Sequence, residues 1–272
     1  QSTLTEFKYL SREWKKNCDE ERLLGVSLTG IMDNPLTNGS KKGLDKLLEE
    51  LRDIAYETNK EWADKLGIPV SAAITCVKPS GTVSQLVDSA SGIHARHNPY
   101  YVRTVRADNK DPLCKMMKEE GFPNEPDVSK PDHTTVFSFP AKSPKGAICR
   151  NDMTAWKQLS LWHTYAKEWC EHKPSVTVSV KEEEWVNTAA WVYENFDDIS
   201  GISFLPFSDH SYRQAPYQDC TEQEYKELVK QMPKNVNWGA LAEYETKDYT
   251  SASQEFACTS AGGCELVDIT PA

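Results

Sequence analysis

The chain has 272 residues, 39% of them hydrophobic, and a formal net charge of −10 at pH 7. This length and apolar content can bury a sizeable core, so we expect a globular protein. The acidic balance argues against a protein that binds duplex nucleic acid, because such binding requires a concentrated surface of lysine and arginine.

Targeting signals and cysteine usage point to the cytoplasm. The sequence has no apolar run near the 18 residues of a membrane span, and residues 1–6 carry no apolar signal segment, so we expect neither membrane insertion nor secretion. Its eight cysteines are mostly isolated, which is typical of cytosolic thiols rather than of a disulfide scaffold. The first residue is Gln1, so we also expect a processed product or a piece of a longer polypeptide.

Short apolar runs alternate with amphipathic helical segments, a pattern typical of an α/β domain with a largely parallel sheet or barrel. Strands are expected at residues 23–28, 72–77, 100–105, 134–139, 175–180 and 199–205. Helices are expected at residues 42–66, 113–121, 152–171 and 182–196, and after the capping-box sequence at 221–224. Without a Gly/Ser linker, residues 1–232 are expected to form one continuous fold and residues 233–272 an irregular, flexible tail.

The strand expected at 72–77 runs into a turn of small residues, made of Pro79, Ser80, Gly81 and Thr82. Successive backbone N–H groups and hydroxyls in such a turn, followed by a helix, can bind a phosphate. An ordinary strand-to-helix connection in which Ser80 caps the helix explains the same residues, and the spacing fits neither a P-loop nor a dinucleotide fingerprint.

A phosphate bound by this acidic chain would need a local source of positive charge, because the net charge repels it. The candidates are three arginines that follow the turn, Arg96, Arg103 and Arg106.

Cys258 and Cys264 flank a glycine-containing segment near the end of the sequence. A flexible loop between two cysteines lets their sulfurs meet at disulfide distance, so a redox-active dithiol is the favoured interpretation. Two unrelated cysteines or a metal site are the alternatives, although two ligands are too few for structural zinc.

The other cysteines and the loop histidines have weaker signals. The remaining six cysteines are expected in the core or as inert surface thiols, and His94, His97 and His210 as hydrogen-bonding loop residues. Residues 207–217 are dense in polar and aromatic groups and could form a ligand-facing loop.

Several stretches occur together in the order of one enzyme family. They are residues 21–30, 79–84, 91–103, 174–178 with Lys181 and 184–185, 199–206, 214–217 and the terminal cysteine pair. As a set they resemble the C-terminal part of the monomeric class II, adenosylcobalamin-dependent ribonucleoside-triphosphate reductases, from about residue 10 onward.

This resemblance implies a ten-stranded α/β barrel of which the chain supplies the later strands, with adenosylcobalamin as cofactor and a ribonucleotide as substrate. The substrate-phosphate loop of the family falls on Pro79, Ser80, Gly81, Thr82, Val83 and Ser84. Its terminal thiol shuttle, which a thioredoxin-like protein reduces, falls on Cys258 and Cys264.

The radical cysteine motif of the family, Asn-x-Cys-x-Glu, is absent from the sequence. We therefore expect the C-terminal portion of a divided or processed reductase, inactive alone and completed by an N-terminal half on another chain. A class I-like reductase large subunit is an alternative, against which residues 214–217 favour the cobalamin branch. A non-catalytic nucleotide-binding module is another.

Overall fold

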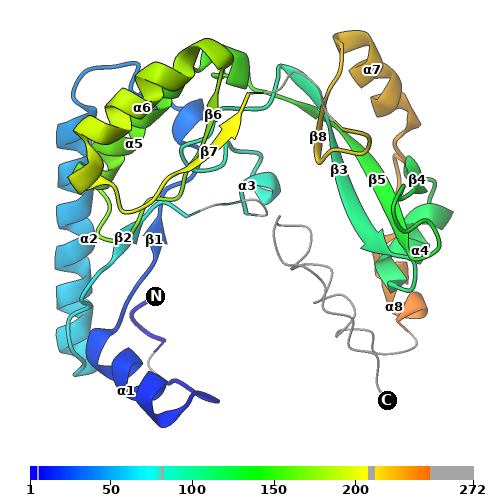
Figure 1. The fold of residues 1–272 in the computed structure, drawn as a ribbon. Helices are drawn as coiled ribbons and strands as arrows, with labels where there is room; N and C mark the ends of the chain where they lie inside the picture. Colours follow the sequence, from blue (N-terminus) through cyan, green and yellow to red (C-terminus); the bar gives the residue numbers. More distant parts are fainter. Residues whose placement is uncertain (5, 79, 81–82, 208–211, 246–272) are drawn as a thin grey trace, which may run out of the picture. The chain divides into compact units, whose positions relative to one another are not determined.

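The computed structural model describes residues 1–4, 6–78, 80, 83–207 and 212–245. The chain divides into two compact units, each with strands of its own (Figure 1). Unit 1 comprises residues 1–96 and 144–208, and unit 2 comprises residues 97–143 and 209–272. The functional division expected from sequence, at residue 232, is a different one and stays a prediction.

Unit 1 contains two parallel strand pairs. Strand β1 (Val26–Ser27) pairs with β2 (Thr75–Cys76), and β6 (Thr177–Val180) pairs with β7 (Ser203–Pro206). The chain entering β6 also runs beside the end of β2, because the Ser175 N–H donates to the Val77 carbonyl at 2.8 Å. The segment before β6 therefore lies beside the end of β2, while the two pairs remain separate two-stranded sheets.

Unit 1 also contains helices. They are α1 (Arg12–Glu21), η1 (Ile31–Asp33), α2 (Leu44–Leu66), α3 (Val83–Leu86), η2 (Arg150–Asp152), α5 (Ala155–Glu168), η3 (Glu182–Glu184), α6 (Trp185–Glu194) and η4 (Phe196–Asp198). Of these, α2, α5 and α6 bury residues in the core. Trp162 and Trp169 lie in the core, and their indole N–H groups donate to the Pro174 and Cys76 carbonyls at 3.1 and 2.8 Å. These two bonds fix α5 and the residue after it to the strand region.

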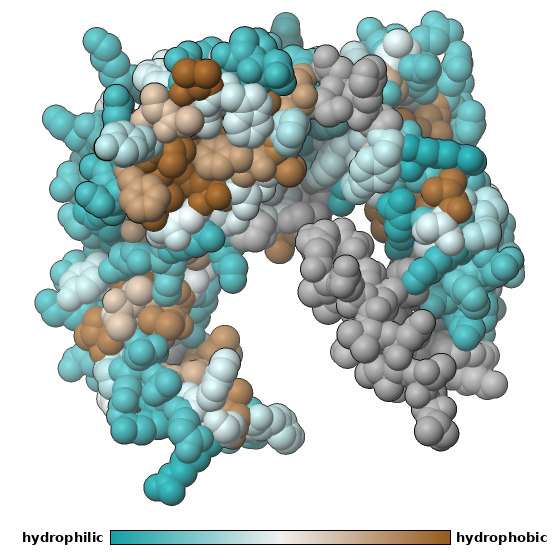
Figure 2. Space-filling model, viewed as in Figure 1, coloured by the Kyte–Doolittle hydropathy of each residue, from teal (hydrophilic) through white to brown (hydrophobic). Residues whose placement is uncertain are grey.

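The outward face of α6 is apolar as well. Val186 and Tyr193 are 81% and 87% exposed, and Phe196 just beyond the helix is 70% exposed. Figure 2 shows apolar side chains gathered over this part of the surface. A surface of this kind often marks an interaction site.

Unit 2 is built on an antiparallel sheet with the strand order β4-β5-β3-β8. The strands are β3 (Tyr100–Asp108), β4 (Asn124–Pro126), β5 (Thr134–Lys142) and β8 (Tyr217–Asp219). The helices are α4 (Pro112–Glu119), α7 (Glu222–Gln231), η5 (Trp238–Ala240) and α8 (Leu241–Tyr244). Cys114, Met117, Phe122 and Phe137 form its apolar core.

Most expected elements are present at their expected places. The long helix at 42–66 and the capping box that opens α7 are confirmed, the latter by reciprocal bonds between Thr221 and Glu224. The expectation of a largely parallel sheet is correct for unit 1 and wrong for unit 2, where β3 pairs antiparallel with β5 over nine residues. Strand direction depends on non-local pairing, which an apolar run does not encode.

The helices within the described ranges are too short or too polar to span a bilayer.

Candidate functional site

The turn predicted to bind phosphate follows β2, and a second loop, residues 28–33, follows the neighbouring strand β1. Because the two strands are parallel, both loops leave the sheet at the same edge, where α/β proteins place their ligand sites. Of the four turn residues, Ser80 is described, whereas Pro79, Gly81 and Thr82 lie outside the described residues.

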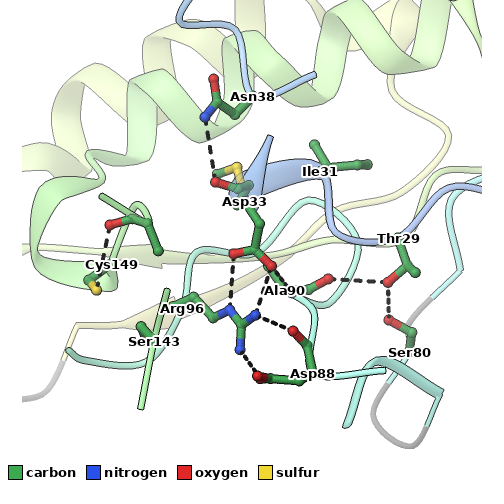
Figure 3. A network of polar contacts seen from close by, with 12 residues as sticks. Thr29, Ile31, Asp33, Asn38, Ser80, Asp88, Ala90, Arg96, Ser143 and Cys149 are labelled. Carbon is green, nitrogen blue, oxygen red and sulfur yellow. Dashed lines mark hydrogen bonds and ion pairs between the residues drawn. The ribbon is translucent and has the colours of Figure 1, made fainter. Parts of the chain in front are cut away.

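Ser80 belongs to a cluster of three hydroxyl groups. Its Oγ lies 3.2 Å from Thr29 Oγ1 and 3.1 Å from Ser91 Oγ. The contact with Thr29 is the dashed line between the two side chains in Figure 3. The Ser80 backbone N–H also donates to Ser91 Oγ, at 3.3 Å. Two other segments of the chain, 51 and 11 residues away in sequence, therefore converge on Ser80.

Val83 and Ser84 continue the turn into α3, which is only four residues long. Val83 is 59% exposed, whereas Ser84 is fully buried. The Ser84 hydroxyl and amide both donate to the Ser80 carbonyl, the amide at 3.3 Å. Ser84 thereby closes the turn at Ser80, and its role toward a phosphate stays a prediction.

An arginine and two aspartates join the loops beside this cluster. Arg96 Nε and Nη2 donate to the two carboxylate oxygens of Asp33 at 3.0 and 2.8 Å, and Arg96 Nη1 donates to Asp88 Oδ1 at 2.9 Å (Figure 3). Asp33 Oδ2 also accepts from the Ala90 N–H at 2.7 Å. With its side chain 4% exposed, Arg96 links the loops instead of supplying a free cation for phosphate, so that expectation is wrong.

The other two candidate arginines belong to unit 2 and have partners there. Arg103 donates to the Pro216 carbonyl at 3.2 Å, and its guanidinium lies over the Tyr217 ring at 4.2 Å. Arg106 Nε donates to Asp127 at 2.8 Å.

The pKa of Asp127 shows how strongly Arg106 and the other hydrogen-bond donors around it stabilise its charged form. Burial alone would raise the pKa of Asp127. Hydrogen bonds from the hydroxyl and amide of Ser129, from Arg106 and from the Lys130 amide lower this pKa to about 2. The Arg106–Asp127 pair is therefore an internal link of unit 2.

His94 connects the loop of the hydroxyl cluster to β6. Its Nδ1 lies 2.9 Å from the Ser91 carbonyl, and its Nε2 accepts from the Thr177 N–H at 3.0 Å. These two bonds require a neutral ring with its proton on Nδ1. Burial lowers the pKa of His94, more than the bond to Ser91 raises it. The expectation of a hydrogen-bonding loop histidine is confirmed.

The other two histidines of the sequence prediction are His97, which belongs to unit 2, and His210. His97 pairs with Asp219 at 2.7 Å and stacks on Tyr217 with ring centroids 5.4 Å apart, so it too is bonded within its unit. His210 lies outside the described residues, as does part of the polar segment at 207–217.

The predicted redox pair, Cys258 and Cys264, lies outside the residues that the structure describes. Cys76, Cys114 and Cys149 are buried, as expected of core thiols. Burial raises the pKa of Cys76 and Cys114, and raises that of Cys170 to about 12. A thiol with so high a pKa is a poor nucleophile, which fits a packing role for these cysteines.

Sequence reasoning missed three residues around the turn. Thr29 and Ser91 complete the hydroxyl cluster, and Lys78, which is exposed, is the cation nearest the turn in sequence. The signal for Lys78 was its place directly before Pro79. The contacts of Ser80 with Thr29 and Ser91 join residues 51 and 11 positions apart, which no local pattern reveals.

Neither a metal site nor a cofactor site can be assigned from the described residues. Within them, no cluster of three or more His, Cys, Asp or Glu could hold a metal ion. A surface cavity of about 640 Å³ lies between the start of α2 and α5, but its lining includes none of the predicted site residues.

Known proteins similar to this chain are reductases. The chain is 29% identical over 235 residues to the adenosylcobalamin-dependent ribonucleoside-triphosphate reductase of Euglena gracilis. The aligned region covers 84% of this chain and 32% of that protein. It is 31% identical over 214 residues to a probable enzyme of the same name from Dictyostelium discoideum, covering 76% of this chain and 28% of the relative. No protein-family model matches the chain.

A solved structure supports the fold. The crystal structure of a B12-dependent (class II) ribonucleotide reductase matches with a TM-score of 0.73 and 21% identity, over 86% of this chain and 36% of that chain. The chain spans about a third of the length of the curated relatives it matches. It is therefore related, over a region of about that length, to the adenosylcobalamin-dependent ribonucleoside-triphosphate reductases, and it has the class II reductase fold in that region.

Proposed function

We propose that the chain is the C-terminal part of an adenosylcobalamin-dependent ribonucleotide reductase, and that it supplies the substrate-phosphate loop and the terminal dithiol. The observation that carries this proposal is the convergence of Thr29, Ser80 and Ser91 at the ends of two parallel strands, in a chain with the class II reductase fold. Hydroxyl and amide donors at such an edge suit a phosphate, which offers only acceptors.

In this proposal, the turn from Pro79 to Ser84 binds the phosphates of a ribonucleoside triphosphate and so fixes the ribose. Lys78 adds positive charge beside the turn in a chain of net charge −10. Adenosylcobalamin, when bound by the complete enzyme, supplies the radical chemistry that starts the reduction. The missing region carries the radical cysteine, since the Asn-x-Cys-x-Glu motif is absent from these 272 residues.

Cys258 and Cys264 act after each turnover. Loss of the ribose 2′ hydroxyl as water leaves two active-site thiols oxidised to a disulfide. The Cys258–Cys264 dithiol then transfers two electrons and two protons to that disulfide by thiol exchange and becomes a disulfide itself. A thioredoxin-like protein reduces this second disulfide.

The dithiol is tested by replacing Cys258 and Cys264 with serine in the enzyme completed with its missing region. Turnover with thioredoxin should fall at least about 100-fold, since the electron path is removed. Turnover with a small dithiol, which can reach the inner disulfide directly, should remain. Equal activity of the variant and the parent with thioredoxin would refute the role of Cys258 and Cys264 as the thiol shuttle. Cys18→Ser, a cysteine on α1, is the matched control.

A second candidate function is a nucleotide-binding module without catalysis. The absent radical motif is the observation that favours it. Reduction of a ribonucleotide by the completed enzyme, with loss of that activity when this chain is omitted, distinguishes the two functions. The class I-like alternative has no comparable support, because the curated relatives reported above are adenosylcobalamin-dependent.

A further inference from the structure

The protons of the hydroxyl cluster can be assigned one by one, because each hydroxyl carries a single proton. Thr29 Oγ1 donates its proton to the Ala90 carbonyl at 3.1 Å. Toward Ser80 the Thr29 hydroxyl can therefore only accept. The single proton of the Ser80 hydroxyl is donated to Ser91 Oγ at 3.1 Å, while Thr29 Oγ1 lies 3.2 Å from the same hydroxyl.

Ser91 differs from both neighbours. Its Oγ accepts twice from Ser80, once from the hydroxyl at 3.1 Å and once from the backbone N–H at 3.3 Å. Across the ranges that the structure describes, no acceptor is recorded for the proton of the Ser91 hydroxyl itself. A partly buried hydroxyl whose acceptor capacity is used and whose proton has no acceptor is prepared to donate to a ligand.

Two features of the backbone hold Ser91 in place. Gly92 has φ +49°, and a Cβ there would lie 3.2 Å from Val77 Cγ1 and 3.3 Å from the Lys78 carbonyl oxygen. Glycine thus lets this loop approach the end of β2 closely. The Ser91 carbonyl is also bonded to His94 Nδ1 at 2.9 Å. The position of Ser91 is therefore fixed before any ligand binds.

We propose that Ser91 is a further phosphate-binding residue of this site, which donates its hydroxyl proton to an oxygen of the substrate's phosphate chain. The inference rests on the proposed function, since it names another contact of the same site. Hydrogen bonds to a charged phosphate oxygen are among the stronger ones in proteins, and a donor that breaks no hydrogen bond within the protein contributes without that cost. Ser80, in contrast, must turn its proton away from a protein acceptor in order to donate.

The test measures binding of tripolyphosphate to the 272-residue chain by isothermal titration calorimetry. Ser91→Ala should weaken affinity about tenfold, as expected for a lost hydrogen bond to a charged group. Ser91→Thr, which retains the hydroxyl, should restore most of it. Ser89→Ala is the matched control on the same loop. The Ser89 hydroxyl also lacks a hydrogen-bond partner in the described part of the chain, but unlike that of Ser91 it is fully buried and inaccessible to a ligand, so affinity should not change.

A double-mutant cycle separates direct donation from support of Ser80. If Ser91 donates to the phosphate itself, Ser91→Ala should still weaken binding about tenfold in a Ser80→Ala background. If Ser91 only holds the Ser80 hydroxyl, the second substitution should have no further effect, and the inference is overturned. Thermal unfolding of each variant shows whether the fold is intact.

The outcomes also separate this inference from the proposed function. Weaker binding in Ser80→Ala together with unchanged binding in Ser91→Ala would refute the role of Ser91 and leave the phosphate site standing. Absence of tripolyphosphate binding by the parent chain at millimolar concentration would contradict the phosphate site itself, and the role of Ser91 with it.

Discussion

His94 shows how a single side chain couples the candidate site to the sheet. Its Nδ1 is bonded to the Ser91 carbonyl, and its Nε2 accepts a hydrogen bond from the Thr177 N–H. The folded state therefore favours the neutral form of the ring. Burial lowers the pKa of this ring. A proton added at Nε2 would break the bond to Thr177 and leave a charge in a buried position.

The stability of the protein should therefore depend on pH through His94. A histidine pKa that is lower in the folded than in the unfolded state contributes stability that is fully present above about pH 6.5. That contribution is lost as pH falls through 6.5 toward the lowered pKa of the folded state. Urea unfolding between pH 5 and 8 should show this loss in the parent and a shallower pH dependence in His94→Gln.

His163→Gln is the control for this measurement, because His163 lies near the surface beside Asp198. The substitution should not change the contribution of His94 to the pH dependence of the free energy of unfolding. Identical pH dependence in the parent and in His94→Gln would contradict the assignment of a buried neutral ring.

At the scale of elements, the loop after β1 and the loop that carries Ser91 are joined by Arg96 and Asp33. The pair is bidentate, and the Arg96 side chain is 4% exposed. Buried ion pairs contribute little net stability when formed, but removing one partner leaves an uncompensated charge. The pair thus matters for the relative position of the two loops.

Arg96→Ala should lower the free energy of unfolding by about 3 kcal/mol, because Asp33 then loses both guanidinium bonds while remaining mostly buried. Lys60→Ala, at an exposed helical ion pair with Glu57, should change it by less than about 0.5 kcal/mol. Chemical unfolding of the two variants provides the comparison. Similar small losses in both would show that the Arg96–Asp33 pair does not hold the loops.

The same elements show what the sequence could and could not predict. Helix α2 and the capping box of α7 follow from local periodicity and from side-chain-to-backbone bonds three residues apart, which are visible in the sequence. The antiparallel direction of β3 and β5 and the pairing of Arg96 with Asp33, 63 residues apart, depend on the folded chain. The sequence alone does not show that Arg96 pairs with Asp33, and it therefore leaves Arg96 as a candidate for binding phosphate.

The candidate site was predictable in part. The turn at Ser80 stands out through its small residues after an apolar strand. Thr29 and Ser91 were hidden, because a lone hydroxyl at the end of a strand or in a loop has many ordinary roles. Only the parallel pairing of β1 with β2 and the close approach at Gly92 bring them to Ser80.

At the scale of the molecule, the chain matches about a third of the length of its curated relatives. The outward face of α6 exposes Val186 and Tyr193, and the sequence lacks the radical cysteine motif. These features support the proposal that the chain functions together with the rest of a reductase, since an exposed apolar face such as that of α6 is typical of an interaction surface.

The most direct measurement combines the purified chain with a polypeptide that carries the missing region, including the Asn-x-Cys-x-Glu motif, and follows deoxyribonucleotide formation with adenosylcobalamin and thioredoxin. We predict product only when both polypeptides are present, and at least about a tenfold rise in KM when the chain carries Ser80→Ala. Ribonucleotide reduction by this chain alone, or undiminished reduction by the other polypeptide without it, would contradict the account.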